Sequence, residues 1–372
     1  MNAPYQRYHL TCVQSAGQSR RAPIPLQLLG QAARYNLNIS VPNIVKNQQI
    51  MTTPNNSNWR IEDCRFEHLE SVRRLFLAVF KSEMSEMHWH WKYGDGRGRG
   101  IVVLRDNELV AFFGGTERRV LFDGEHLVAM QCGDSMVAES YRGILTRKGP
   151  FYLSVTAFLG KYVGDGLPYL LSYGFPNARA MSLAQRLELY DDVGAMLEIE
   201  WTAQTNSGYE ALAFDFASPD HGQVAGDLWE SMAGDFADRA IGVRDLTYLK
   251  HRYLDNPTLK YDFHMVRPTG NEETLGLLVS RKTDDGLLLV DAVCRKQHLK
   301  HLIEFGKNRA AELACGKFYG WLTKIDLPLI IDTDPIAGAE PLRLPLGVYS
   351  PGLVAEDIRD KWFFLCGDSD FL

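Results

Sequence analysis

Three absences narrow the kinds of protein that this 372-residue sequence encodes. No apolar run approaches the ~18 residues of a membrane-spanning helix, so we expect no membrane insertion. No apolar segment follows the arginines in residues 1–30, so the sequence predicts no secretory signal peptide. An excess of basic residues is also missing, because the net charge is −6, and this argues against nucleic-acid binding.

The cysteines lack the spacing of a metal site or of a disulfide framework. Six are scattered along the chain: Cys12, Cys64, Cys132, Cys294, Cys315 and Cys366. No two of them form a CxxC pair, and none lies near a histidine at a zinc-ligand interval. This pattern is typical of reduced thiols, and it predicts a cytoplasmic protein that binds no metal.

Composition and length divide the chain into three parts. Residues 1–58 are rich in Gln, Asn, Ser and Pro and have little periodicity. They are interpreted either as a disordered tail or as a wrongly assigned start upstream of Met51. The remaining length exceeds that of one ordinary core and suits two. We therefore expect one domain over residues 59–205 and a second over residues 206–372.

Hydrophobic periodicity predicts an α/β (α+β) fold for the first of these domains. The expected helices cover residues 67–79, 151–163 and 177–189. The expected strands cover residues 60–64, 101–104, 109–113, 120–122, 126–138 and 167–173, with a hairpin turn at Asp123-Gly124. Antiparallel strands followed by a β-loop-α-β unit imply a mixed sheet.

The second half repeats this order of features, which indicates an internal duplication. The matching pairs are Trp91-Lys92-Tyr93 with His251-Arg252-Tyr253, Asp123-Gly124 with Asp285-Gly286, Asp134 with Asp291, and helix 151–163 with helix 298–313. Ordered correspondence of this kind marks a repeat better than any single match does. We expect two tandem mixed-sheet domains packed on each other, with chance similarity of two α/β patterns as the alternative.

The stretch from Val137 to Phe151 is a candidate anion-binding loop. A predicted strand ends at its start, and Pro150 suits the first position of the helix that follows. Between them lie two glycines and three cations: Arg142, Gly143, Arg147, Lys148 and Gly149. Free backbone N–H groups and the positive end of a helix dipole suit a pyrophosphate. A solvated basic turn is the alternative, whereas Walker A and GxGxxG motifs are absent here.

The segment Val137-x-x-x-Tyr141-Arg142-Gly143 resembles the strand-to-loop signature of the GCN5-related N-acetyltransferase (GNAT) superfamily. In that family an Arg/Gln-x-x-Gly-x-Gly/Ala loop binds the coenzyme A pyrophosphate, and pantetheine inserts between two splayed central strands. The stretch from Tyr173 to Asn177 looks like the strand end and helix start on the other side of that cleft. The resemblance covers residues 59–200, with a weaker similarity over residues 225–345.

This resemblance implies acetyl-CoA, or another acyl-CoA, as co-substrate. The residues that it assigns to the cofactor are Met136, Val137, Ala138, Arg142, Gly143, Arg147, Lys148, Gly149 and Asn177. The loop departs from the family pattern because Ile144–Lys148 separates its two glycines. In the second half, Val293–Leu299 lacks loop glycines, so we expect that copy to bind coenzyme poorly or not at all and to shape the acceptor pocket.

Acyl transfer to an amine needs a base for the amine proton. Asp134 is the first candidate because it precedes the loop on the central strand, and Glu139 is the second. The alternative for Asp134 is a buried carboxylate that pairs with a cation, an interpretation that the matching Asp291 supports.

The leaving thiolate needs an acid, which many members of the family supply as a tyrosine. In this chain that position falls near Ala184, so the usual acid is missing. Tyr190 and Tyr173 are the candidate substitutes. Trp89, Trp91 and Tyr93 are expected to pack at a helix end or to line the acceptor cleft.

These features predict an N-acyltransferase that moves an acetyl group from coenzyme A to the primary amine of a small molecule, such as an amino sugar. Two alternatives stay open: an aminoacyl-transferase of the cell-wall-precursor type, and a non-catalytic acyl-CoA-binding regulatory protein. The sequence identifies neither the acceptor nor the oligomeric state, because acceptor pockets are built from variable loops.

Overall fold

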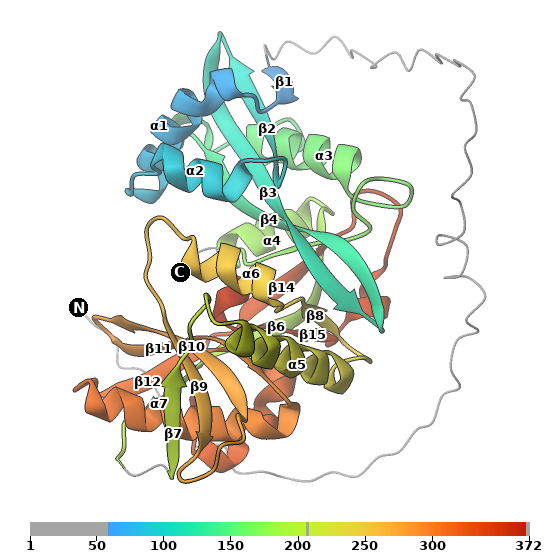
Figure 1. The fold of residues 1–372 in the computed structure, drawn as a ribbon. Coiled ribbons are helices and arrows are strands. Elements are labelled where there is room, and N and C mark those ends of the chain that lie inside the picture. The colour runs from blue at the N-terminus through green and yellow to red at the C-terminus, as the bar shows by residue number, and fades with distance from the viewer. Residues whose placement is uncertain (1–58, 206–207, 370–372) are drawn as a thin grey trace. The chain divides into compact units, whose positions relative to one another are not determined.

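The computed structural model describes residues 59–205 and 208–369 (Figure 1). Both interpretations of residues 1–58, as a disordered tail or as a wrongly assigned start, concern residues outside this description. The described residues form two mixed sheets with helices packed on them, so the predicted α/β (α+β) class is confirmed.

The first sheet has the strand order β1-β2-β3-β4-β5. Its strands are β1 (Trp59–Asp63), β2 (Gly98–Arg105), β3 (Glu108–Phe122), β4 (Glu125–Val137) and β5 (Ser172–Gly174). The first four pair antiparallel, and β5 lies parallel to β4. The predicted hairpin between β3 and β4 is confirmed, because Asp123 and Gly124 both have positive φ, 47° and 83°.

Helices cover both faces of this sheet. They are α1 (Leu69–Phe80), α2 (Glu86–Tyr93), α3 (Pro150–Tyr162) and α4 (Ala178–Arg186). Because successive strand residues point to opposite faces, Phe112 packs in the cluster with α1 and α2, whereas Phe113 packs in the cluster with α3. Ser85 caps α2 by accepting a hydrogen bond from the His88 N–H at 3.1 Å.

The second sheet has the strand order β13-β6-β12-β11-β10-β9-β7, and β14 pairs with β6. Its strands are β6 (Tyr190–Thr202), β7 (Tyr209–Ala213), β9 (Asp262–Pro268), β10 (Gly276–Thr283), β11 (Gly286–Cys294), β12 (Lys317–Thr323), β13 (Ile336–Ala337) and β14 (Leu342–Gly347). The accompanying helices are α5 (Pro219–Asp235), α6 (Leu246–Leu249), α7 (Leu299–Glu312) and α8 (Ala355–Ile358). A π-helical turn, Lys250–Leu254, extends α6.

The same order of elements recurs in the two halves. In the second half, β9, β10 and β11 pair antiparallel, and β12, which follows α7, lies parallel to β11. In the first half, β2, β3 and β4 pair antiparallel in the same way, and β5, which follows α3, lies parallel to β4. Strands β4 and β11 each carry a bulge, and each bulge holds an aspartate that accepts a hydrogen bond from a tyrosine. The Tyr93–Asp134 distance is 2.5 Å and the Tyr253–Asp291 distance is 2.6 Å.

Strands are exchanged across the domain boundary that the sequence predicts at residues 205 and 206. Strand β6 precedes the boundary but lies in the second sheet. Two later strands, β8 (Ala240–Gly242) and β15 (Trp362–Phe363), lie in the first sheet, where β8 pairs with β3. The exchange ties the two sheets together through the backbone.

The expected strand over residues 167–173 is wrong, since only Ser172–Gly174 forms a strand there. Gly164 and Gly166 have φ of 136° and 72°, which keep this segment in turns. Tyr169 forms only an isolated bridge with Val163.

A buried ionic network joins the elements of both halves. Arg244, which follows β8, lies 2.8 Å from Asp291 of β11 and 2.5 Å from Asp368, and all three side chains are 0% exposed. Arg118 of β3 also approaches Asp368, at 3.4 Å. Arg244 further donates to the Gly242 carbonyl at 2.8 Å, so its guanidinium is fixed on three sides.

Candidate active site

A cleft opens where β4 and β5 separate. The two strands pair over three positions only, ending at Cys132 and Gly174, after which β4 continues to Val137 and the other chain turns into α4. A cavity of about 480 Å³ lies at this separation. Aromatic side chains from three elements and from the segment after β5 contribute to its lining: Phe76, Phe80, Phe113, Phe175 and Tyr190. We refer to it as the acyl cleft.

The β4 bulge directs Asp134 into this cleft. Three residue steps on β4, from Gly133 to Met136, oppose two on β3, and Asp134 has a φ of 50°. Its carboxylate lies 2.9 Å from Lys92 Nζ and accepts the Tyr93 hydrogen bond, while 10% of the side chain stays exposed. The bulge also interrupts the ladder, so Asp134 and Ser135 are not paired in register with β3.

The loop between β4 and α3 ends in a tight turn that requires glycine. A Cβ on Gly149 would lie 2.0 Å from the Ile144 carbonyl oxygen, whereas a Cβ on Gly143 would meet nothing within 4 Å. Gly149 is the N-cap of α3, and no side chain caps the helix. The first N–H groups of α3 are therefore available to an anion.

The three cations of this loop have different surroundings. Arg147 pairs with Glu188, which balances its charge. Arg142 donates to the Val137 carbonyl at 2.9 Å, and both Arg142 and Lys148 are exposed. These two side chains are the ones that the loop offers to phosphate groups.

The remaining residues that the sequence assigned to the cofactor have contacts within the protein. The Met136 side chain is buried in the core beside α1, and the Ala138 N–H already donates to Val110 at 2.8 Å. Val137 packs on the opposite face of β4. Asn177 lines the acyl cleft and caps α4 by accepting from the Ala180 N–H at 2.9 Å.

Solved structures share this arrangement over most of the chain. N-acetyltransferases of the GCN5-related family from Kribbella flavida and Anabaena variabilis match with TM-scores of 0.53 and 0.56, at 14% and 13% identity. The matches cover 77% and 78% of this chain and 70% and 73% of theirs. An N-myristoyltransferase from Saccharomyces cerevisiae with bound myristoyl-CoA matches with a TM-score of 0.53 at 12% identity, over 90% of this chain and 94% of the other.

The chain has the GNAT fold. At these identities the likeness concerns the fold. No protein-family model matches the sequence, and no curated protein does.

Within the GNAT fold, the two candidate acids differ. Tyr173 donates to Gln131 at 3.2 Å, and its ring stacks on Phe364 at 5.1 Å, so packing accounts for it. Tyr190 also lines the acyl cleft, and its hydroxyl forms no hydrogen bond with another described residue. Burial raises the pKa of Tyr190 well above its usual value, which keeps the phenol protonated and able to donate.

The two bulge aspartates of this GNAT fold also differ. Asp291 is fully buried and bound to Arg244, so it is a structural carboxylate. Asp134 has the equivalent tyrosine contact but lines a cavity. Glu139, the second candidate base, is exposed in the turn after β4.

A second cavity of about 480 Å³ lies beside the acyl cleft, and the sequence did not predict it. Its charged lining consists of one carboxylate, Glu117, and five cations: Lys92, Arg97, Arg118, Arg119 and Arg252. We refer to it as the cationic cavity. The repeated tripeptides carried a signal for it, because Lys92 and Arg252 occupy matching positions in them and both reach this cavity.

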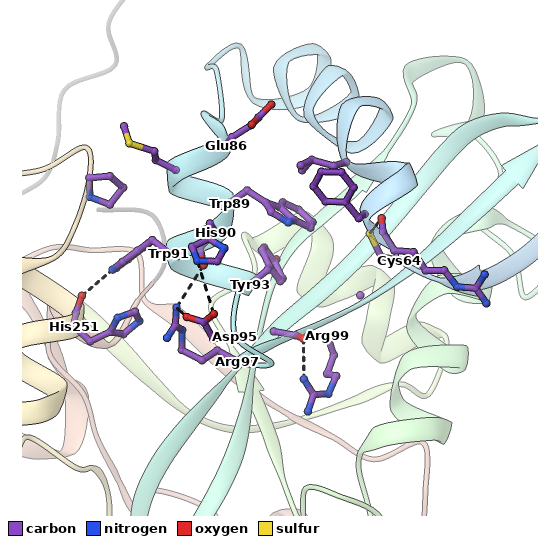
Figure 2. A pocket seen from close by; sticks show the side chains of 18 of the residues that line it. Cys64, Glu86, Trp89, His90, Trp91, Tyr93, Asp95, Arg97, Arg99 and His251 are labelled. Carbon is purple, nitrogen blue, oxygen red and sulfur yellow. Dashed lines mark hydrogen bonds and ion pairs between the residues drawn. The ribbon is translucent and has the colours of Figure 1, made fainter.

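A third, larger cavity of about 920 Å³ lies along α2 (Figure 2). Figure 2 shows Trp89, Trp91 and Tyr93 projecting from this helix. Trp89 and Tyr93 stack at 4.3 Å, and the Trp91 indole N–H donates to the His251 carbonyl at 2.7 Å. These aromatic residues thus both pack at the helix end and line a cavity.

The described residues were also compared with the requirements of a metal site and of a membrane-spanning helix. Across residues 59–205 and 208–369, no group of three or more His, Cys, Asp or Glu side chains could hold a metal ion. No helix in this part of the chain combines the length and hydrophobicity needed to cross a bilayer.

Proposed function

We propose that this chain is an N-acyltransferase that moves an acyl group from coenzyme A to the primary amine of a small molecule. The observation that carries the proposal is the acyl cleft, where β4 leaves β5 beside a bulge and close in sequence to the uncapped start of α3. The yeast N-myristoyltransferase, which shares this fold, has myristoyl-CoA bound in its structure, and this supports an acyl-CoA as the co-substrate.

The proposed cofactor site has two parts. The N-terminus of α3, with Arg142 and Lys148, binds the pyrophosphate, and Gly149 allows the close turn. The pantetheine arm fills the acyl cleft between Asn177 and the β4 bulge. Holding the thioester there supplies the proximity that amine attack requires.

The proposed chemistry uses Asp134 and Tyr190. The amine nitrogen attacks the thioester carbonyl carbon, and the amine proton goes to the Asp134 carboxylate, directly or through water. The carbon–sulfur bond then breaks, and the Tyr190 hydroxyl gives its proton to the departing sulfur. Lys92, 2.9 Å from Asp134, and Tyr93 hold the carboxylate in place. Solvent returns the proton from Asp134 to Tyr190.

The first test is calorimetric titration of acetyl-CoA into the full chain and into an Arg142→Ala/Gly149→Ala variant. We expect the wild type to bind and the variant to bind more weakly. Absence of binding by folded wild type would remove coenzyme A from the proposal. Thiol release with a panel of primary amines then measures turnover.

Two Tyr→Phe variants, one of them a control, test whether Tyr190 is the general acid. Tyr190→Phe should keep acetyl-CoA binding and lose about 10²-fold or more in kcat, the scale of a lost general acid. Tyr162→Phe is the matched control, because its hydroxyl faces Asp63 at 3.1 Å outside the acyl cleft. Binding without turnover in the wild type, for every amine, would favour a regulatory acyl-CoA-binding protein instead.

We also propose a cytoplasmic location. The five cysteines that the structure describes are all free thiols, which supports a reducing compartment. Labelling of intact cells and fractionation would test it.

A further inference from the structure

The cationic cavity meets the acyl cleft along β4. Lys92 lines the cationic cavity, and its Nζ lies 2.9 Å from the Asp134 carboxylate, which lines the acyl cleft. Gln131 also lines the cationic cavity, and its amide oxygen accepts the hydrogen bond of Tyr173 in the cleft wall. A molecule in the cationic cavity is therefore one side chain away from the proposed reaction centre.

Two cations of this cavity, Arg118 and Arg252, are held in place by contacts with the protein. Arg118 is 5% exposed, donates to the Val243 carbonyl at 2.7 Å, and lies 3.6 Å above the Tyr248 ring. Arg252 donates to the carbonyls of Gly367 and Ser369 at 3.1 and 2.6 Å. Fixed guanidinium groups lose little conformational entropy when an anion binds them.

Donor capacity remains in this wall, and its acceptor capacity is already used. The Nε atoms of Arg97 and Arg118 have no hydrogen-bond partner among the described residues. Glu117, in contrast, accepts from Arg99 at 3.2 Å and from Tyr169 at 2.6 Å. Four of the five cations also contact a carboxylate that does not line the cavity: Lys92 contacts Asp134, Arg97 contacts Asp95, Arg118 contacts Asp368 and Arg119 contacts Asp245. The surplus in the lining is therefore mainly one of hydrogen-bond donors, which favours a ligand that brings acceptors, such as a carboxylate or a phosphate.

We propose that the cationic cavity binds an acidic group of the acceptor, a carboxylate or a phosphate, so that the acceptor is an amine that also carries a negative charge. This inference rests on the proposed function, because it assigns the acceptor to the cavity next to the acyl cleft. The acidic group lies among the guanidinium groups, and the amine reaches past Lys92 toward the thioester.

The same positive charge selects against other amines. A primary amine attacks only when neutral, and neighbouring cations lower the pKa of an amine and so favour its neutral form. A second ammonium group on the acceptor would meet one carboxylate in the lining, Glu117, which already accepts hydrogen bonds from Arg99 and Tyr169. Diamines and polyamines are therefore expected to be poor acceptors.

The experiment compares acceptors that differ only in charge, with the full chain and acetyl-CoA. The anionic probes are β-alanine and O-phosphoethanolamine, their neutral counterparts are 3-aminopropanol and ethanolamine, and the dication is 1,3-diaminopropane. We expect at least one anionic probe to exceed its neutral counterpart about tenfold or more in kcat/KM, the size of a charge-assisted hydrogen bond. A higher kcat/KM for β-alanine than for O-phosphoethanolamine would identify the acidic group of the acceptor as a carboxylate. The opposite order would identify it as a phosphate.

Variants locate the effect in the cavity. Arg252→Gln, and the half-exposed and therefore safer Arg119→Gln, should raise KM for the anionic probe about tenfold and leave acetyl-CoA affinity unchanged. Arg74→Gln, at an exposed position of α1 outside the cavity, is the matched control. Equal kcat/KM for anionic and neutral probes, a preference for the diamine, or unchanged KM in both variants would overturn the inference.

A binding measurement separates this inference from the proposed function. Titration of inorganic phosphate and of β-alanine into the protein needs no turnover. Binding that Arg252→Gln or Arg119→Gln weakens supports the anion site even if no acetyl-CoA binds, in which case only the proposed function fails. Acetyl-CoA binding with no anion binding and no charge preference removes the anion site alone.

Discussion

Replacing Arg244 by methionine tests whether burial, rather than distance, sets the strength of an ion pair in this protein. Arg244 makes two charged contacts, with Asp291 at 2.8 Å and with Asp368 at 2.5 Å, and all three side chains are 0% exposed. Methionine keeps most of the side-chain length but leaves the buried Asp291 without its guanidinium, and it leaves Asp368 with only the longer contact to Arg118 at 3.4 Å. Breaking a buried ion pair from one side costs about 3–5 kcal/mol. Two hydrogen bonds to charged groups, at about 1.5–3 kcal/mol each, give a similar total.

The matched comparison is Lys161→Met. Lys161 lies 2.5 Å from Asp63, as close as the shorter Arg244 contact, but the two side chains are 49% and 41% exposed. An exposed pair contributes about 0–1 kcal/mol. Urea denaturation of both variants gives the change in the free energy of unfolding. Equal losses in the two variants would refute the argument from burial.

A rescue experiment tests the cause of the loss. If the unpaired Asp291 carboxylate is responsible, adding Asp291→Asn to Arg244→Met should restore part of the lost stability, whereas Asp368 stays unchanged because it keeps its contact with Arg118. A double variant that is less stable than Arg244→Met would mean that the Asp291 carboxylate has further stabilising contacts that outweigh the removed charge. The Tyr253 hydroxyl, 2.6 Å from Asp291, is the nearest such contact in the structure.

Two further predictions concern the loop and the acidic limit of stability. Gly149→Ala should weaken acetyl-CoA binding about tenfold or more, because its Cβ would displace the Ile144 carbonyl. Gly143→Ala should bind acetyl-CoA like the wild type, since its Cβ meets nothing within 4 Å. Calorimetry measures both affinities, and equal values would contradict the assignment of the loop to the cofactor. Burial lowers the pKa of three histidines from the ordinary 6.5: His251, His264 and His301. Between these lowered pKa values and 6.5 the unfolded chain therefore binds more protons than the folded one, so stability is lost as the pH falls from about 6.5 through the lowered pKa values. A urea midpoint at pH 5.5 equal to or above that at pH 7.5 would contradict this.

Local rules were enough for much of the fold. The Asp123-Gly124 pair predicts its turn because few residues tolerate positive φ, and Pro150 predicts the start of α3 because its φ suits the first helical position. The helix expected over residues 67–79 occupies Leu69–Phe80, since its apolar spacing is strong. The prediction that the loop from Val137 to Phe151 binds phosphate rests on the same local information.

Sites built from distant segments were beyond such rules. Arg118 and Arg252 reach one cavity only because β3 lies against the turn after α6, and nothing near either residue indicates that meeting. The role of Asp134 was left between base and structural carboxylate, because the sequence does not reveal whether its side chain faces a cavity. The order of strands in each sheet was likewise unpredictable, since β6 is adjacent in sequence to one sheet and pairs in the other.

Because strands are exchanged between the sheets, the first sheet cannot be completed until late in synthesis of the chain. The first sheet contains β8, which pairs with β3, and β15, which pairs with β8 and ends at Phe363. At 5–20 residues per second, a ribosome takes roughly 12–50 seconds to go from the end of β3 to the end of β15. During the first half of that interval β3 lacks its neighbour β8, which pairs with it at Leu121, and until the end of the interval β8 lacks β15. The nascent N-terminal half is therefore expected to need protection by a chaperone until the last part of the chain emerges.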